Sequence, residues 1–245
     1  MPFTLSHPAI ILPLTYLPKK RISLTGLVVG SLTPDFEYFI RMKVRSSYSH
    51  TLDGLLWFDL PLGIILTFIF HLIIRNTLFR NLPSFLNERF FTFTQFNWIN
   101  HFKRNWIVVI LSILIGSASH IFWDSFTHDH GYFVENIKFI PNHKVEIIGI
   151  IFPIHKIIQH LSTIIGAFVI LISILKLPKN GMSNKINYKY WSLIFVISTI
   201  IVLIKVLMGL SINQYGNVLV TGISAVIMAL ILAPFLIKRF SNDMN

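Results

Sequence analysis

The segment Ser119–His130, SHIFWDSFTHDH, places metal-binding types of side chain at a regular spacing. His120, Asp124 and His128 recur at every fourth position, so on an α-helix they form one stripe along one face. Imidazole nitrogens and carboxylate oxygens are the usual zinc ligands where cysteine is not used. Ionisable groups beside a long apolar segment usually face a partner or a cavity. The spacing therefore predicts a metal site, the alternative being three unrelated polar residues at a helix end.

Other histidines and carboxylates lie near the ends of further apolar segments. Ser6 is expected to be the N-cap of a short helix with Pro8 in its first turn, which places His7 at the start of that helix. Asp35 follows an apolar stretch at a helix boundary, and His50 precedes the first long apolar segment. These positions supply the remaining candidate ligands.

The composition indicates the class of protein. Of the 245 residues, 53% are hydrophobic and 13% are charged, whereas soluble domains carry about 25% charged residues. We therefore expect an integral membrane protein in contact with the lipid bilayer. The net charge of +11 is spread among apolar segments, and no basic helix has an aromatic reading face, so nucleic acid is not an expected partner. Because cysteine is absent, any metal must be held by nitrogen and oxygen.

The apolar segments predict an all-α fold, a polytopic bundle of transmembrane helices. A spanning helix needs about 20 residues, and the expected spans are Gly54–Ile74, Trp106–Trp123, Ile157–Leu175, Trp191–Leu210 and Val218–Ile237. Two shorter apolar segments, 3–17 and 22–32, are expected to form a helical pair at the N-terminus. We predict a single integral membrane domain over residues 1–245. Its motifs lie in residues 1–176, and residues 177–245 add two further transmembrane helices.

The distribution of basic residues predicts the orientation in the membrane. Lys and Arg are in excess in segments 75–105 and 176–190 and at Lys238–Arg239, which indicates that these segments face the cytoplasm. Alternation of the spans then places segment 124–156 and His50 on the outer side. The candidate ligands are therefore expected on one face of the membrane.

The order of these residues resembles the bacterial membrane-bound metal-dependent hydrolase superfamily. The shared features are a His near the N-terminus, a Pro-Asp after an apolar stretch, a Ser-His, and a later His-x3-Asp-x3-His. The segments MPFTLSHPAIILPL, GSLTPDFEYF and SHIFWDSFTH are more similar to one branch of uncharacterised membrane proteins, known only as a domain of unknown function. This resemblance implies an integral protein of the bacterial inner (cytoplasmic) membrane.

A more distant similarity is to the all-helical zinc-dependent phospholipase C fold, whose ligands follow a similar order. By that resemblance the chain would bind a divalent metal, zinc in that fold, as two or more ions. The chain lacks the later His-x3-Glu of that pattern, and His155-x3-Gln159 is the nearest substitute. The implied ligands are His7, Asp35, His50, His120, Asp124 and His128.

The chemistry expected at such a site is hydrolysis, because zinc lowers the pKa of bound water and polarises a phosphoryl oxygen. Asp35 is a candidate bridging ligand or general base, and Glu37 is the second candidate catalytic carboxylate. Glu37 and Asp53 could also orient ligand imidazoles through the free N–H groups of those rings. An anionic lipid or phosphoester substrate could be attracted by Arg41, Lys43 and Arg45.

Three functions are compatible with these residues. The leading hypothesis is a membrane-bound metal-dependent hydrolase with an outward-facing site that acts on a phosphoester or lipid-derived substrate. The second is a non-catalytic scaffold or interaction protein in which the metal only holds helices together. The third is a cation or proton transporter. The transporter is disfavoured because the polar residues gather at helix ends and outer loops, not in the middle of broken helices.

Overall fold

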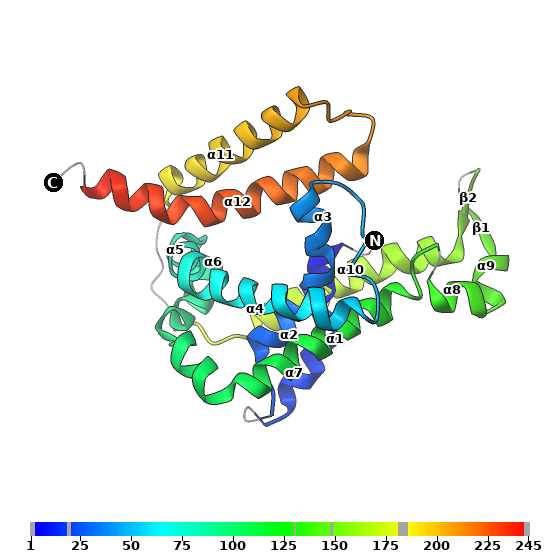
Figure 1. The fold of residues 1–245 in the computed structure, drawn as a ribbon, viewed down its shortest axis with the longest axis horizontal. Coiled ribbons are helices and arrows are strands. Elements are labelled where there is room, and N and C mark those ends of the chain that lie inside the picture. The colour runs from blue at the N-terminus through cyan, green and yellow to red at the C-terminus, as the bar shows by residue number, and fades with distance from the viewer. Residues whose placement is uncertain (1–2, 19–20, 130, 148, 181–185, 243–245) are drawn as a thin grey trace. The chain divides into compact units, whose positions relative to one another are not determined.

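The computed structural model of the chain describes residues 3–18, 21–129, 131–147, 149–180 and 186–242 (Figure 1). His130 and residues 181–185 of the basic segment at 176–190 lie outside these ranges. Nearly all the described secondary structure is helical. The exception is a hairpin of β1 (Lys144–Ile147) and β2 (Ile150–Pro153), which pair antiparallel with Lys144 opposite Pro153. The all-α prediction is confirmed.

Five described helices are long and apolar enough to cross a membrane, as the sequence predicts. The first is one continuous helical segment, in which π-helical turns at Leu55–Asp59 and Phe70–Ile74 flank α4 (Leu60–Ile69) and lead into α5 (Arg75–Asn81). It therefore continues past the predicted end at Ile74. The other four are α7 (Trp98–Asp124), α10 (Ile154–Leu175), α11 (Tyr188–Leu207) and α12 (Tyr215–Asn242).

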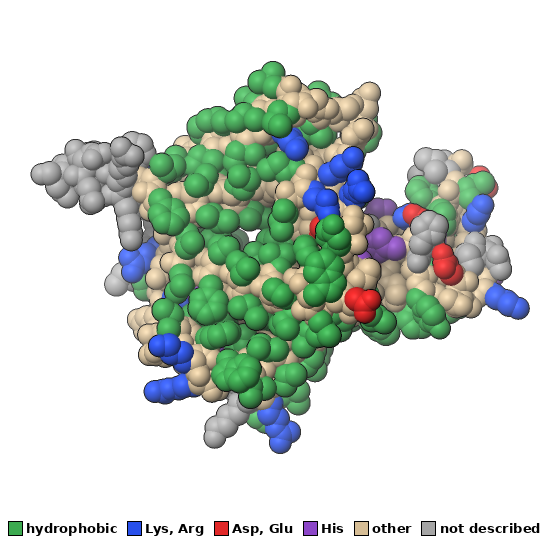
Figure 2. Space-filling model, in the orientation of Figure 1, with side chains coloured by type: hydrophobic (Ala, Val, Ile, Leu, Met, Phe, Trp, Pro, Cys, Tyr) green, Lys and Arg blue, Asp and Glu red, His purple; other side chains and the backbone are tan. Residues whose placement is uncertain are grey.

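The surfaces of these helices are apolar. Within the most apolar windows of α10 and α11, only 11% of the residues are buried inside the protein. Hydrophobic side chains cover much of the face drawn in Figure 2. Side chains such as Phe168 on α10 and Phe195 on α11 are 61% and 71% exposed. Extended apolar surfaces of this kind are stable in contact with lipid, so the chain is an integral membrane protein.

The chain forms two compact units, each built from separate segments. The first unit contains residues 1–35, 48–64 and 104–176, and the second contains residues 36–47, 65–103 and 177–245. The boundary within α7 falls next to Asn105, whose φ of −133° and ψ of 25° break the helical geometry. The single-domain organisation of the chain stays a prediction.

In the first unit, α2 (Leu24–Leu32) approaches α7 through small residues. A Cβ atom on Gly30 would overlap the backbone of Ile113, and one on Gly116 would overlap the carbonyl of Leu27. Ser117 Oγ donates to the Gly30 carbonyl at 3.0 Å. Small residues and hydroxyl groups are the usual means by which membrane helices pack closely. This contact fixes α2 against the half of α7 that precedes the His/Asp stripe.

The N-terminal segment of the first unit packs on α10. A turn of 3-10 helix, Thr4–Ser6, leads into α1 (Pro8–Ile11), and both contact α10. The prediction that Ser6 caps α1 is wrong. Residues 4–6 already form a turn, so the Ser6 hydroxyl donates back to the Phe3 carbonyl at 2.7 Å, and His7 occupies the N-cap position. Pro8 does stand in the first turn of the helix, as predicted.

The second unit is held together by its own apolar core. Tyr190 and Ile194 of α11 pack with Ala229 and Ala233 of α12. The short helix α3 (Phe36–Arg41) is joined to α12 by Ser224, whose hydroxyl lies 2.8 Å from the Phe39 carbonyl. The remaining helix of this unit is α6 (Ser84–Phe90). The site described below lies entirely in the first unit, where α8 (Tyr132–Asn136) and α9 (Phe139–Asn142) complete the helices.

Candidate metal centre

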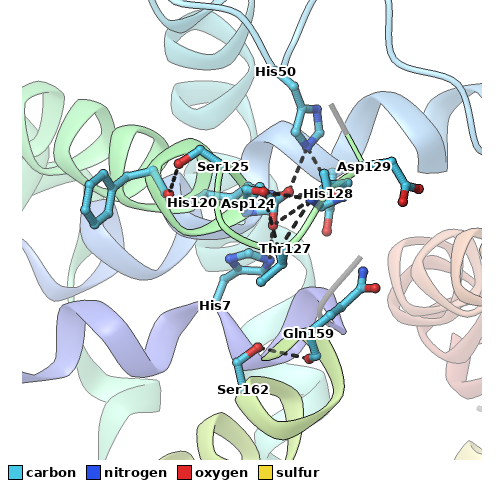
Figure 3. A network of polar contacts seen from close by, with 12 residues as sticks. His7, His50, His120, Asp124, Ser125, Thr127, His128, Asp129, Gln159 and Ser162 are labelled. Carbon is cyan, nitrogen blue, oxygen red and sulfur yellow. Dashed lines mark hydrogen bonds and ion pairs between the residues drawn. The ribbon is translucent and has the colours of Figure 1, made fainter. Parts of the chain in front are cut away.

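Five of the six predicted ligands meet at one place in the first unit, although they come from distant parts of the chain. Figure 3 labels four of them, His7, His50, His120 and Asp124. His120 and Asp124 lie one helical turn apart at the end of α7. His7 lies between the Thr4–Ser6 turn and α1, Asp35 ends the 3-10 turn Thr33–Asp35, and His50 lies in the loop before the first span. We call these five residues the His/Asp cluster.

The nitrogen and oxygen atoms of the His/Asp cluster face one another at nearly uniform separations. His120 Nε2 lies 3.3 Å from Asp124 Oδ2 and 3.6 Å from Asp35 Oδ1. His50 Nε2 lies 3.5 Å from Asp124 Oδ2 and 3.6 Å from Asp35 Oδ1. His7 Nε2 lies 3.5 Å from Asp124 Oδ1. All are longer than the usual 2.7–3.2 Å of a nitrogen–oxygen hydrogen bond.

Several of these atoms are buried without a hydrogen-bond partner among the described residues. They include both ring nitrogens of His7, Oδ1 of Asp35, Nε2 of His120 and both carboxylate oxygens of Asp124. His120 and Asp35 are completely buried, and Asp124 is 5% exposed. Buried polar atoms in proteins are nearly always paired, because an unpaired one costs about 1–3 kcal/mol. A convergent group of unpaired ligand atoms is therefore an unusual feature that a bound cation would explain.

The separations suit ligands around a small divalent metal. With metal–ligand bonds of 2.0–2.1 Å, the edges of a tetrahedral zinc site are about 3.3–3.4 Å long. The observed values of 3.3–3.6 Å are close to these edges. Two triplets could hold an ion, one with His7 and Asp35 and the other with His50 and Asp124, and both include His120. Because both triplets use the same His120 ring, they describe one shared centre.

Hydrogen bonds outside the cluster orient its imidazole rings. His120 Nδ1 lies 2.7 Å from the carbonyl oxygen of Ser31 on α2. Since a carbonyl only accepts, Nδ1 carries a proton, and Nε2 is the ring nitrogen directed toward the cluster. His50 Nδ1 lies 3.0 Å from Ser49 Oγ, so its Nε2 likewise faces the carboxylates. Such bonds commonly fix the ring orientation and tautomer of metal-binding histidines.

Two further contacts fix Asp35 and His7. The Thr4 hydroxyl donates to Asp35 Oδ2 at 2.5 Å, which leaves Oδ1 directed at His50 and His120. The His7 ring stacks on the His120 ring, with centroids 3.6 Å apart and planes 13° apart. Sequence reasoning missed Thr4 and the Ser31 carbonyl. The proximity of Thr4 to His7 in sequence was the only available signal, and it was a weak one.

His128 lies at the edge of the cluster. Its Nδ1 lies 3.1 Å from the Asp124 carbonyl and 3.6 Å from Asp124 Oδ1. Its Nε2 is buried without a hydrogen-bond partner in the described chain. The side chain is 30% exposed, against 18% for His50 and none for His120. His128 and His50 thus form the accessible side of the site, and histidine side chains reach the surface in Figure 2.

The protonation states of the residues outside the spans suit metal binding. Burial, with the neighbouring His120, lowers the pKa of His7 to about 3. Burial opposes ionisation of Asp35, but His120 and His50 outweigh it and hold the pKa of Asp35 below its usual range. For His50, burial is outweighed by Asp124 and Asp35, which raise its pKa, so this ring would lose a proton on binding a metal. His7 is therefore neutral and Asp35 ionised at neutral pH.

Glu37 does not belong to the His/Asp cluster. It lies in the second unit, where its carboxylate accepts from Arg41 Nε at 2.9 Å, Ser46 Oγ at 3.1 Å and the Ser47 backbone N–H at 2.9 Å. These bonds close the turn after α3. Arg41 is engaged in the same ion pair, and the side chain of Asp53 is exposed.

The His155-x3-Gln159 pair contributes no ligand to either triplet. His155 Nε2 lies 2.7 Å from Asp129 Oδ1, and Lys156 pairs with the other oxygen of that carboxylate at 3.0 Å. Gln159 is buried on α10, and its amide nitrogen has no partner among the described residues. In Figure 3 the contact drawn to Gln159 runs from the Ser162 hydroxyl to the Gln159 carbonyl.

Comparisons with known proteins identify the family. No curated protein and no solved structure matches the chain, so neither supports the hydrolase or the phospholipase C resemblance. A family model described as a domain of unknown function, DUF4184, matches residues 1–235. That match covers both units and every residue of the candidate centre, and the chain therefore belongs to the DUF4184 family.

Proposed function

We propose that the protein is a membrane-bound, metal-dependent hydrolase of phosphoesters, whose His/Asp cluster binds a divalent metal, zinc by preference. The main support for this proposal is that buried nitrogen and oxygen atoms of His7, Asp35, His120 and Asp124 converge without hydrogen-bond partners among the described residues. The donor set of imidazole nitrogens and carboxylate oxygens, with separations close to the edges of a tetrahedral site, favours zinc. The basic segments and the family resemblance support a place in the bacterial inner membrane.

The residues of the cluster divide into holding and reacting roles. His7, His120 and Asp124 are nearly completely buried and would hold the metal. A divalent metal would supply Lewis acidity and lower the pKa of a bound water molecule. Asp35 is the candidate bridging ligand or general base: the Thr4 hydroxyl holds its Oδ2, and its Oδ1 faces His50 and His120.

The accessible edge of the site favours catalysis over a purely structural metal. Structural zinc sites are closed by protein ligands, whereas catalytic sites keep a position for water or substrate. His50 and His128 are the partly exposed members here. A substrate could therefore reach the metal from this side.

The metal content of the detergent-purified protein, measured by mass spectrometry, tests the proposal. We expect stoichiometric metal in the wild type and loss of metal in His120→Ala and Asp124→Ala. The matched control is His143→Ala in the same unit, because His143 is exposed and its Nδ1 contacts the Phe139 carbonyl. Absence of metal from the folded wild type after attempted reconstitution would contradict the proposal.

Hydrolysis of a chromogenic phosphodiester then separates a catalytic from a structural metal. Turnover by the metal-loaded wild type should stop on addition of a chelator and return when metal is restored. Full metal occupancy without turnover of any phosphoester tested would favour the scaffold function.

A further inference from the structure

An apolar cavity adjoins the candidate centre. Its volume is about 360 Å³, within the range of about 300–1,000 Å³ found for small-molecule pockets. It is lined by residues of α1, α10 and the end of α7, all in the first unit. His7 lines it, and so does Trp123, the residue that precedes Asp124. The cavity therefore adjoins the His/Asp cluster at His7.

The polar side chains in the cavity wall other than His7 already make hydrogen bonds within the protein. The Ser6 hydroxyl donates to the Phe3 carbonyl at 2.7 Å, and the Ser162 hydroxyl donates to the Gln159 carbonyl at 2.9 Å. The rest of the wall consists of side chains such as Ile10, Ile158 and Ile165 together with Gly166. An occupant would therefore find no hydrogen bond along the wall, which suits a hydrocarbon chain.

The polar end of the cavity is set by His7. Neither of its ring nitrogens has a hydrogen-bond partner among the described residues, and its Nε2 lies 3.5 Å from Asp124 Oδ1. In Figure 3, His7 lies between the cluster and Ser162, a residue of the cavity wall. A molecule in the cavity would thus have one end at the metal ligands and the remainder among apolar side chains.

The close approach of α10 to the N-terminal turn closes this cavity on one side. A Cβ atom on Gly166 would lie 2.8 Å from Ser6 Cβ and 2.9 Å from the Ser6 carbonyl oxygen. The contact holds α10 beside the turn that precedes His7. The apolar wall and the ligand are therefore fixed in position by the same part of the fold.

We propose that this cavity binds the single hydrocarbon chain of an amphipathic phosphoester whose head group reaches the His/Asp cluster. The inference rests on the proposed function, and it names the substrate class as a lipid-like phosphoester. The head group is held at the cluster, and the chain lies between α1 and α10.

Binding of two soluble probes, ethyl phosphate and hexyl phosphate, to the metal-loaded protein tests this assignment. Each buried methylene contributes about fourfold in affinity, so hexyl phosphate should bind at least about tenfold more tightly than ethyl phosphate. Calorimetry on the full-length protein in detergent measures both affinities, and the metal content is determined on the same sample.

Two adjacent isoleucines of α10 provide a matched pair of variants. Ile165 lines the cavity and is 60% exposed, whereas Ile164 does not line it and is 55% exposed. In Ile165→Trp, hexyl phosphate should no longer bind more tightly than ethyl phosphate, and the affinity for ethyl phosphate should be unchanged. Ile164→Trp should still bind hexyl phosphate more tightly than ethyl phosphate.

The outcomes distinguish this inference from the proposed function. Equal affinity for both probes would overturn the cavity assignment. The same difference in affinity between the two probes in both tryptophan variants would also overturn it. So would failure of both probes to bind a metal-loaded protein. Absence of metal from the wild type would instead overturn the proposed function.

Discussion

Two groups of buried polar side chains interrupt the apolar helices. One group makes hydrogen bonds to the surrounding protein, and the other does not. In the second unit, Arg75 donates to the carbonyl oxygens of Phe96 at 2.8 Å and Thr94 at 3.2 Å, and it contacts His71 Nδ1 at 2.8 Å. His71 in turn stacks on Trp98, with centroids 4.5 Å apart. In the first unit, the facing atoms of His7, His120 and Asp124 have no hydrogen-bond partner among the described residues.

The difference indicates what each group does. A buried cation whose donors meet acceptors stabilises the fold, because it satisfies backbone carbonyls of a second segment. Buried ligand atoms that face one another without bonds destabilise the protein until a cation binds. The Arg75 group is therefore expected to be structural, and the His/Asp cluster is expected to depend on metal.

The largest effect should come from removing the metal. At a metal concentration 1,000 times the dissociation constant, binding stabilises the folded state by about 4 kcal/mol. Chelation should therefore lower the thermal unfolding temperature of the wild type in detergent. Asp124→Asn should unfold at the same temperature with and without chelator. A chelator-sensitive Asp124→Asn variant would show that the stabilising metal binds elsewhere.

The next largest effect is expected at Arg75. Arg75→Met should lower the free energy of unfolding by about 3 kcal/mol, because two backbone carbonyls lose their donors at about 1–3 kcal/mol each. The metal content per folded molecule should not change. Thermal unfolding and metal analysis of the same sample check both statements. Loss of metal without loss of stability would reverse the roles of the two groups.

A smaller effect is expected from the packing of α2 on α7. Gly30→Ala should destabilise the protein by about 1–3 kcal/mol, because the added methyl group overlaps the Ile113 backbone. Metal affinity should also fall, since the Ser31 carbonyl that orients His120 would move. Gly222→Ala on α12 is the control, because a Cβ there meets nothing within 4 Å. Equal stability of the two variants would show that α2 and α7 pack less closely.

The smallest effect is expected at Thr4. Thr4→Val removes the hydroxyl that fixes Asp35, and loss of such an outer contact typically lowers metal affinity about 10–100-fold. We expect a change near the lower limit, measured by competition with a metal-binding dye. Thr15→Val is the control, because the Thr15 hydroxyl donates to the Leu12 carbonyl on an exposed segment. Identical metal affinity in both variants would mean that Thr4 does not position Asp35.

The pattern of amino acids along the chain was enough to predict the spanning helices and the stripe of residues on α7. Long apolar segments must satisfy their backbone hydrogen bonds internally in a membrane, so hydropathy alone predicts the helices. His120 and Asp124 share a face because the helical repeat places residues four apart together. The ends of the helices were less predictable. The first span continues through Arg75–Asn81 because Arg75 finds acceptors in a distant segment.

Which other residues meet this stripe depends on how the helices pack, and the sequence pattern does not give that packing. Order along the chain made His7, Asp35 and His50 candidates, but their convergence depends on the packing of α1 and α2 on α7 and α10. Glu37 looked equivalent to Asp35 in sequence, yet the backbone places its carboxylate in the turn after α3. Thr4, the Ser31 carbonyl and the apolar cavity have no sequence pattern. They arise from contacts between segments far apart in the chain, and no local propensity encodes such contacts.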